Sequence, residues 1–255
     1  EAFIWFEQEA LTLETGLGAW PREKEQLEKL LVADDVEMEE VRPLAVLHVE
    51  GPNAADALAQ AGISGAHSLK PWTCTKSVNA MLGRISRFGA DAFSLLGDRM
   101  VLSEVANRLA QAGASRVGEA VLEIIRVEQG LARVGIDTGD RTIALEARLE
   151  RAISFDKGCY LGQETIERAT ARGGLKKKLF GLRLKRAVAP GAILSLAGKE
   201  VGRITSAVVS PRMGALGLSI LHHSAWTPGG ALAARDANGE TEAIVSEIPF
   251  QISSR

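Results

Sequence analysis

The chain has 255 residues, of which 46% are apolar and only 5% aromatic, and its formal net charge is −2. A chain of this length can bury a large core, and we expect two packed units rather than one. The charge balance excludes a protein that binds polyanions by bulk charge alone. Arg, Glu or Gly interrupts the longest apolar runs well before they reach the length of a bilayer span, so we expect a soluble, cytoplasmic protein that does not enter membranes.

The cysteines and the first residues of the chain indicate the redox environment and the targeting of the protein. The two cysteines, Cys74 and Cys159, have no zinc-type spacing and make no disulfide framework, which suits a reducing compartment. The chain opens at Glu1 without a methionine and shows no signal peptide. It enters an apolar stretch at 3–6 almost at once, so we expect that an N-terminal segment is missing.

Periodicity predicts three strand-then-helix units in the first half of the chain. Strands are expected at 3–6, 44–49 and 92–96. Helices are expected from Pro21, over 53–60 and from about Ser103, and a fourth helix at about 119–129 ends at Gly130. Residues 1–174 are therefore predicted to be an α+β region.

Beyond Gly174 the pattern changes to a period of two. Phe180, Leu182 and Leu184 alternate with more polar or smaller residues, which is typical of a half-buried strand. Short apolar runs then alternate with Pro-Gly, Ala-Gly and Asn-Gly turns. Residues 175–255 are therefore predicted to form a small antiparallel β-barrel.

The octapeptide at 157–164 concentrates residue types that carry chemistry. It holds one of the two cysteines, the only tyrosine, two glycines, a lysine and an adjacent Gln-Glu pair. In an extended segment Lys157 and Cys159 point to the same side, and the ammonium group then stabilises a thiolate by roughly 1 kcal/mol. Gly162 lets the backbone turn into a short helix at 163–168, whose positive end is expected to face Cys159. Two interpretations stay open: a reactive thiol, or a small buried hydrophobic residue.

The region around the octapeptide is strongly basic. From Lys157 to Arg186 there are nine Lys or Arg residues against two acids, a local balance of +7 in a chain whose total is −2. Such a segment suits an anionic ligand tail or an RNA backbone. A solvated basic face is the equally open alternative.

The octapeptide, followed by Arg168, resembles the signature of the folate-binding YgfZ family, whose members are relatives of the glycine-cleavage T-protein, an aminomethyltransferase. Residues 126–130 are similar to the family's Arg-x-Glu-x-Gly, residues 135–137 resemble its Gly-x-Asp, and residues 201–207 resemble a Val-Gly-x-x-Thr-Ser segment of its barrel. Further similar pieces are Glu146-Ala147, Arg172-Gly173, 217–219 and 248–250.

The resemblance implies a ring of two α+β subdomains, followed by the small C-terminal antiparallel β-barrel, around a channel that binds tetrahydrofolate. It matches Glu128 to a glutamate that contacts the pterin, and a carboxylate can accept two hydrogen bonds from such an edge. An acid on the helix surface, paired to Arg126 or a lysine, is the alternative. Lys157 and Cys159 are the predicted catalytic residues. The other predicted folate-binding residues are Arg126, Tyr160, Gly162, Gln163, Glu164 and Arg168.

No metal site is predicted. His222 and His223 follow a strand-like run, and adjacent histidines in a strand face opposite ways, so they chelate one ion poorly. Cys74 lies among β-branched residues and is expected to be buried.

Three functional hypotheses follow. In the first, the protein is a monomeric, tetrahydrofolate-binding accessory protein and not a conventional enzyme; it serves iron–sulfur client proteins in cluster assembly or repair, and through them tRNA modification, with Cys159 as the functional thiol. In the second, it is an aminomethyltransferase of the glycine cleavage system that transfers a methylene group to tetrahydrofolate. In the third, residues 172–186 contact RNA weakly.

Two departures from the T-protein pattern favour the first hypothesis. Typical members begin with a segment that contains a Gly-Arg-Ile-x-x-Asp-like motif, whose Asp is the catalytic acid in the T-protein, and this is the N-terminal segment that we expect to be missing. Residues 81–87 are only superficially similar to the motif, because Phe88 stands where the Asp is expected and their order in the chain fits a later strand better. T-proteins also usually carry an acidic residue at the position of Cys159.

Overall fold

The computed structural model describes residues 2–7, 10–16, 18–32, 35–41, 44–77, 79–89, 91–171 and 174–252. The chain divides into two compact units, Glu1–Arg116 and Val117–Arg255, called here the N-terminal and the C-terminal unit. The Arg172-Gly173 pair of the family resemblance, which also opens the predicted RNA-contacting segment, lies outside the described residues.

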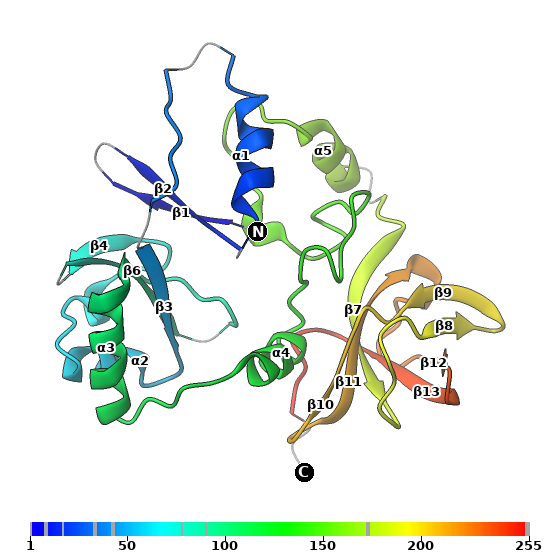
Figure 1. The fold of residues 1–255 in the computed structure, drawn as a ribbon. Coiled ribbons are helices and arrows are strands. Elements are labelled where there is room, and N and C mark those ends of the chain that lie inside the picture. Colours follow the sequence, from blue (N-terminus) through cyan, green and yellow to red (C-terminus); the bar gives the residue numbers. More distant parts are fainter. Residues whose placement is uncertain are drawn as a thin grey trace. The chain divides into compact units, whose positions relative to one another are not determined.

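The N-terminal unit is built on a four-stranded antiparallel sheet. In spatial order its strands are β3 (Leu44–Glu50), β6 (Ala92–Asp98), β5 (Ala80–Gly83) and β4 (Cys74–Ser77). Helices α2 (Ala54–Gln60) and α3 (Arg99–Gln111) cover one face of this sheet, with the 3₁₀ turn η1 (Ala66–Ser68) between them in the chain (Figure 1). The core between sheet and helices contains Leu58, Leu82, Phe93, Leu95 and Leu109.

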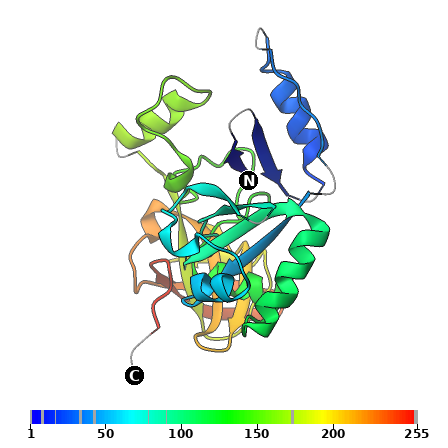
Figure 2. The ribbon, with the colours of Figure 1, turned by 90° about the vertical axis from the view of Figure 1, so that its left-hand side faces the viewer.

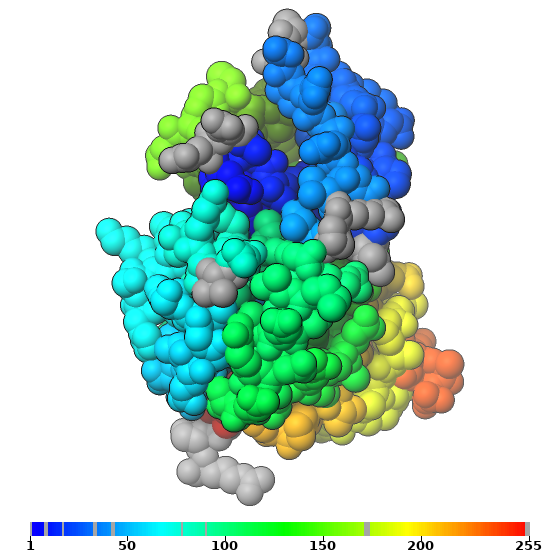
Figure 3. All heavy atoms as spheres, turned by 60° about the vertical axis from the view of Figure 1, so that its left-hand side comes forward, coloured from blue at the N-terminus to red at the C-terminus, as the bar shows by residue number. Residues whose placement is uncertain are grey.

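Helix α3 begins where its sequence supplies a cap. The carboxylate of Asp98 accepts a hydrogen bond from the backbone N–H of Met100 at 2.7 Å, which satisfies one of the free donors of the first turn. Leu102, Val105 and Leu109 follow at helical spacing and face the sheet, as Figure 2 shows for the helix as a whole. The opposite side of α3 forms part of the surface seen in Figure 3.

A hairpin precedes this sheet in the chain. Strands β1 (Ala2–Phe6) and β2 (Leu11–Thr15) pair antiparallel, and helix α1 (Trp20–Glu28) follows. Trp5 is only 1% exposed and packs against Met81, Ile85 and Leu96. Its indole N–H donates to Glu14 at 3.1 Å, and Arg87 pairs with the same carboxylate at 2.5 Å.

The second and third predicted strand-then-helix units are present, as β3 with α2 and β6 with α3. The first is wrong in detail, because β2 lies between the strand at 3–6 and α1, and strands β4 and β5, between the second helix and β6, were not predicted. Strands β2 and β4 have only five and four residues, with threonines or charged residues at alternate places, so they give a weak apolar signal.

The C-terminal unit contains helix α4 (Glu119–Glu128), the 3₁₀ turns η2 (Glu150–Ala152) and η3 (His223–Ala225), helix α5 (Gln163–Ala171) and a curled, seven-stranded antiparallel sheet. The spatial order of the strands is β10 (Ser206–Ser210), β11 (Gly214–His222), β7 (Lys177–Leu184), β13 (Gly239–Ser246), β12 (Ala231–Asp236), β8 (Ile193–Leu196) and β9 (Lys199–Arg203). The predicted fold class, an α+β region followed by a curled antiparallel sheet, is confirmed. The predicted domain boundary at 174/175 stays a prediction.

The curled sheet buries side chains on both of its faces. Phe180, Leu182 and Leu184 point into its concave core, as their alternation predicts. Leu179 of β7 and Leu218 of β11 point to the opposite face of the sheet and pack with Val127 of α4 in a second cluster. This second cluster fixes the C-terminal end of α4, which carries Arg126 and Glu128, against strands β7 and β11.

The last described residues close over the same place. The backbone N–H of Phe250 donates to the carbonyl oxygen of Glu128 at 2.9 Å. A Cβ atom on Gly130 would lie 2.3 Å from Cβ of Ile248, and one on Gly181 would lie 2.4 Å from the Phe250 ring. Both glycines are therefore needed for this close approach.

Candidate functional site

The C-terminal end of α4 holds a buried cluster of charges. Arg126 is 7% and Asp137 3% exposed, and a guanidinium nitrogen of Arg126 donates to Asp137 at 2.7 Å. The same guanidinium donates to both carboxylate oxygens of Glu123, at 2.9 and 2.6 Å, and to Ser206 at 2.6 Å. Thr205 and Ser206 in turn donate to Asp137. The cluster thus joins α4, the loop after it and the beginning of β10.

The pKa shifts in this cluster follow from the pairing. Burial alone would lower the pKa of Arg126, but the hydrogen bond to Glu123 and the charge of Asp137 outweigh burial and raise it. The hydrogen bond from Arg126 holds the pKa of Glu123 below its ordinary value, against the opposite effect of burial. Arg126 and Glu123 are therefore both charged at neutral pH, and the directed hydrogen bonds of Arg126 are committed to protein partners.

Glu128 lies two residues further along α4, in a second buried arrangement. It is 3% exposed, and its two oxygens accept hydrogen bonds from the Ser210 hydroxyl at 2.6 Å and from Arg212 at 2.7 Å. Ser210 also accepts the backbone N–H groups of Arg212 and Met213, at 3.1 and 3.0 Å. The turn between β10 and β11 therefore orients the carboxylate of Glu128, whereas the Arg212 side chain itself is 60% exposed.

The octapeptide forms an exposed turn that leads into α5. Cys159 is an exposed free thiol, and Gly162 adopts a φ of +89°, a conformation that favours glycine. The ammonium group of Lys157 lies 5.0 Å from the centre of the Tyr160 ring. No hydrogen bond joins Lys157 to the thiol within the part of the chain that the structure describes.

The rest of the octapeptide stabilises the start of α5. The side-chain oxygen of Gln163 accepts the backbone N–H of Tyr160 at 3.2 Å, and its amide nitrogen donates to Glu167 at 2.6 Å. Glu164 and Arg168 form an exposed ion pair one helical turn apart. Exposed pairs of this kind contribute only about 0.3–0.5 kcal/mol to stability, so turning either side chain toward a ligand would cost little free energy.

A cavity of about 490 Å³ lies beside this turn. Lys157, Tyr160 and Gly162 line it together with apolar groups from the preceding loop and α5, among them Ile143, Ile153 and Ile166. Its volume lies in the range of small-molecule sites, and its lining is mostly apolar with a few polar groups. Cys159 lies in the same turn but is not one of the lining residues.

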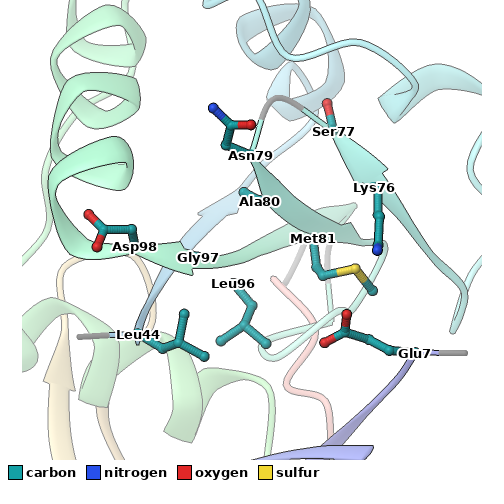
Figure 4. A pocket seen from close by; sticks show the side chains of 10 residues that line it. All are labelled: Glu7, Leu44, Lys76, Ser77, Asn79, Ala80, Met81, Leu96, Gly97 and Asp98. Carbon is teal, nitrogen blue, oxygen red and sulfur yellow. The ribbon is translucent and has the colours of Figure 1, made fainter. Parts of the chain in front are cut away.

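A larger cavity of about 630 Å³ lies in the N-terminal unit. It is bordered by the sheet on the face opposite to α2 and α3, where Leu44, Met81 and Leu96 provide an apolar floor. Figure 4 shows Lys76 and Glu7 on one side of this floor and Asp98 on the other. None of the predicted site residues lines this cavity.

The structure thus brings the predicted site residues together in two groups. Lys157, Cys159, Tyr160 and the beginning of α5 form one, and Arg126 with Glu128 on α4 forms the other. No hydrogen bond or ion pair joins the two groups among the residues that are described. The alternative for Glu128, a helix acid paired to Arg126 or a lysine on the surface, is replaced by a buried acid paired to Arg212.

The polar partners Ser206, Ser210 and Arg212 were not predicted as site residues, although Ser206 lies in the segment 201–207 that resembles the family's barrel. A further signal was that Arg126 and Glu128 sit two residues apart in a helix otherwise rich in apolar residues. Charged residues on such a face need partners if they are buried, but the partners lie about 80 residues further along the chain.

The histidine prediction was wrong in geometry. The rings of His222 and His223 do not face opposite ways; their centres lie only 4.1 Å apart, because β11 ends at His222 and His223 opens a 3₁₀ turn. In the described ranges, no group of three or more His, Cys, Asp or Glu side chains is placed to hold a metal ion. Cys74 is half-buried and not buried, since it packs at the edge of the Trp5 cluster.

Within those same ranges, no helix combines the length and the apolar character that crossing a bilayer requires.

Comparisons with known proteins bear on the whole chain. The family model of the GCVT N-terminal domain matches residues 6–157, and that of the glycine cleavage T-protein C-terminal barrel domain matches residues 177–251. A chloroplast protein of Arabidopsis thaliana, named as a transferase, is 34% identical over 139 residues, which are 54% of this chain and 32% of that protein. An aminomethyltransferase of Rubrobacter xylanophilus is 30% identical over 195 residues, 72% of this chain and 52% of that protein.

Among solved structures, the glycine cleavage system aminomethyltransferase T from Bartonella henselae has the same fold. Its TM-score is 0.86 at 21% identity, over 98% of this chain and 71% of that one. The chain spans about a third to three fifths of the length of the curated relatives it matches. Because the N-terminal family match alone covers more than half of the chain and the barrel match continues it, the chain belongs to the family of the glycine cleavage T-protein.

Proposed function

We propose that this protein binds tetrahydrofolate and acts as an accessory protein in the assembly or repair of iron–sulfur clusters, and through its client enzymes in tRNA modification. Folate binding is supported by the family, whose members include aminomethyltransferases. The accessory role is supported by the thiol of Cys159, which is exposed in the turn that contributes Lys157 and Tyr160 to the 490 Å³ cavity. That exposed thiol is the observation on which the proposal rests.

The cavity suits one part of the folate molecule in particular. Its aliphatic walls and the Tyr160 ring favour a flat aromatic group, and Lys157 supplies a cation for a carboxylate. In the proposal the aminobenzoyl-glutamate portion lies here. Glu128 keeps unused lone pairs on its two oxygens after binding Ser210 and Arg212, and a pterin edge reaches them when the more exposed Arg212 side chain turns aside.

An exposed thiol has chemistry that a buried one lacks. It can approach a sulfur or an iron of a partner protein, and a thiolate is the form that ligates iron or attacks a disulfide. In the proposal Cys159 makes this contact with the client while folate occupies the neighbouring cavity. Gly162, whose backbone conformation favours glycine, sets the direction of the turn.

Folate binding is tested by titrating the protein with tetrahydrofolate in a calorimeter. Lys157→Ala and Glu128→Gln are each expected to weaken binding about tenfold, which is the loss of roughly 1.4 kcal/mol for a charged hydrogen bond. Glu119→Gln, an exposed acid in the first turn of the same helix as Glu128, is the matched control and should bind like the wild type. Absence of saturable binding by the wild type would reject the proposal.

The thiol is tested separately, with Cys159→Ser. This variant should bind tetrahydrofolate with unchanged affinity and yet fail to support an iron–sulfur client enzyme. Cys74→Ser, at the half-buried second cysteine, should retain full support. Full support by Cys159→Ser would remove the thiol from the proposal and leave only folate binding.

A second candidate is an aminomethyltransferase of the glycine cleavage system. It is favoured by the names of several curated relatives and by the fold shared with the Bartonella henselae protein. A glycine-cleavage assay with a lipoylated carrier protein separates the two candidates. Turnover to methylene-tetrahydrofolate that survives Cys159→Ser would establish the second candidate and reject the first.

A further inference from the structure

The beginning of β7 and the end of β11 are paired, and together they carry basic residues at one end of these two strands. Figure 1 shows the two strands side by side. Lys177 is the register partner of His222, so the two side chains project from the same face. The backbone N–H of His223 donates to the carbonyl oxygen of Lys176 at 2.9 Å, which holds the next pair together. We name Lys176, Lys177, His222 and His223 the Lys–His edge.

The rings at this edge are ordered by their contacts. The His222 and His223 ring centres are 4.1 Å apart, and His223 meets the ring of Trp226 edge-on, with centres 6.4 Å apart. Trp226 is fixed in turn, because its indole N–H donates to the carbonyl oxygen of Leu221 at 2.8 Å. The planes of the two histidine rings are tilted by 40°, and His223 is the exposed member of this group, so its ring is held by its neighbours and accessible to solvent.

Pairing within the protein engages part of the basic segment of residues 157–186. Several of its cations are engaged by the protein: Arg168 by Glu164, Lys185 by Glu242, Arg186 by Asp236, and Arg183 by the carbonyl oxygen of Gln251. Lys176 and Lys177 are exposed and form no ion pair with any described residue. Exposed Lys157 in the octapeptide and half-buried Lys178 also form no ion pair with a described residue, and Lys176 and Lys177 are the unpaired cations that lie beside the histidine rings.

We propose that the Lys–His edge binds a short segment of single-stranded RNA. Lys176 and Lys177 hold neighbouring phosphates, and a base stacks on the open face of His223. The exposed hydroxyl of Ser224, 3.0 Å from Nδ1 of His222, offers a partner for a 2′-hydroxyl group.

The exposed aromatic ring favours RNA over an acidic protein as the partner. An acidic peptide needs cations only, and the ring of His223 would add nothing to its binding. A base needs a flat face next to the cations, and this edge supplies both on adjacent strands. The chain as a whole carries a net charge of −2, so its other surfaces do not attract a polyanion in general.

The inference is tested by fluorescence anisotropy with a labelled RNA of about 12 nucleotides, at salt concentrations from about 50 to about 200 mM. Two phosphate contacts give a slope of about −1.4 in log K against log salt, which is about a sevenfold loss over this range. The double variant Lys176→Glu, Lys177→Glu should lose at least tenfold in affinity and nearly all of the salt dependence. Lys199→Glu, the same type of substitution at a single exposed position in the β8–β9 hairpin, should bind like the wild type.

The stacking role is tested at His223. His223→Ala should weaken RNA binding about tenfold, whereas His223→Phe, which keeps a flat ring, should stay within about threefold of the wild type. Circular dichroism spectra identical to the wild type show that the variants fold. The inference fails if the wild type does not bind RNA at the lowest salt, if His223→Ala binds normally, or if polyglutamate binds as tightly as RNA. Equal affinity for single-stranded DNA would remove the role of Ser224 and overturn the assignment to RNA.

Discussion

Asp137→Ala is expected to destabilise the C-terminal unit severely. The Asp137 carboxylate accepts hydrogen bonds from Arg126 at 2.7 Å, from Ser206 at 2.7 Å, from the backbone N–H of Arg133 at 2.9 Å and from Thr205. Removing one partner of a buried ion pair costs about 3–5 kcal/mol, because the other charge stays buried without compensation.

The expected value lies at the lower end of that range, about 3 kcal/mol. Arg126 keeps two hydrogen bonds to Glu123 and one to the carbonyl oxygen of Leu131 after the change, so its charge is not left alone. A loss of about 3 kcal/mol is nevertheless a large fraction of the 5–15 kcal/mol that stabilise a typical domain.

The measurement is urea unfolding followed by hydrogen exchange on proteolytic peptides, which reads the C-terminal unit separately from the N-terminal unit. Peptides that contain β10 and the loop after α4 should lose protection first. Asp140→Ala, an exposed acid three residues further along the same loop, is the matched control and should change stability by less than about 0.5 kcal/mol. If both variants lose the same small amount, the buried cluster does not hold α4 to the sheet and the reasoning is wrong.

Two further predictions concern the same unit. Gly130→Ala should lower the free energy of unfolding in urea by about 2–4 kcal/mol, because the new Cβ atom would lie 2.3 Å from Ile248 and the backbone φ of +68° is strained for alanine. The control Gly191→Ala has a φ of +93° but open space around it, so it should lose only about 1–2 kcal/mol. Equal losses in the two variants would contradict the clash. Hydrogen bonds from Arg186 lower the pKa of Asp236 to about 2 from 3.8, so this carboxylate stabilises the fold above about pH 4 and ceases to do so as the pH falls toward 2. Wild type and Asp236→Asn should therefore differ in stability at pH 6 and converge in acid, and a difference that persists at pH 2 would exclude this titration as its cause.

Much of the secondary structure was predictable because its determinants are local. The helix at 53–60 is bounded by Gly51-Pro52 and Gly62, and α4 stops before Gly130, which adopts a φ of +68°. The alternation at 180–184 predicted a strand with one buried face, and this strand, β7, lies between β11 and β13 in the curled sheet. The four-residue and five-residue strands β4 and β2 were missed, since so few residues carry too little pattern.

The candidate site was predictable only in part. Composition singled out the octapeptide, and the structure shows it as an exposed turn beside a cavity. The ionic partners of Arg126 and Glu128 were not predictable, because Ser206, Ser210 and Arg212 follow about 80 residues later and carry no local signal of their own.

The sequence by itself determined the kinds of element in this chain, the family to which it belongs and the residues with unusual chemistry, because helix ends, strand alternation and short motifs are properties of neighbouring residues. Only the tertiary structure decided which charges are available. It buried Arg126 and Glu128 against partners from the sheet, engaged four cations of the basic segment and left Lys176 and Lys177 without an ion pair beside two neighbouring histidine rings. Burial and pairing depend on contacts between distant parts of the chain, and a local pattern does not contain them.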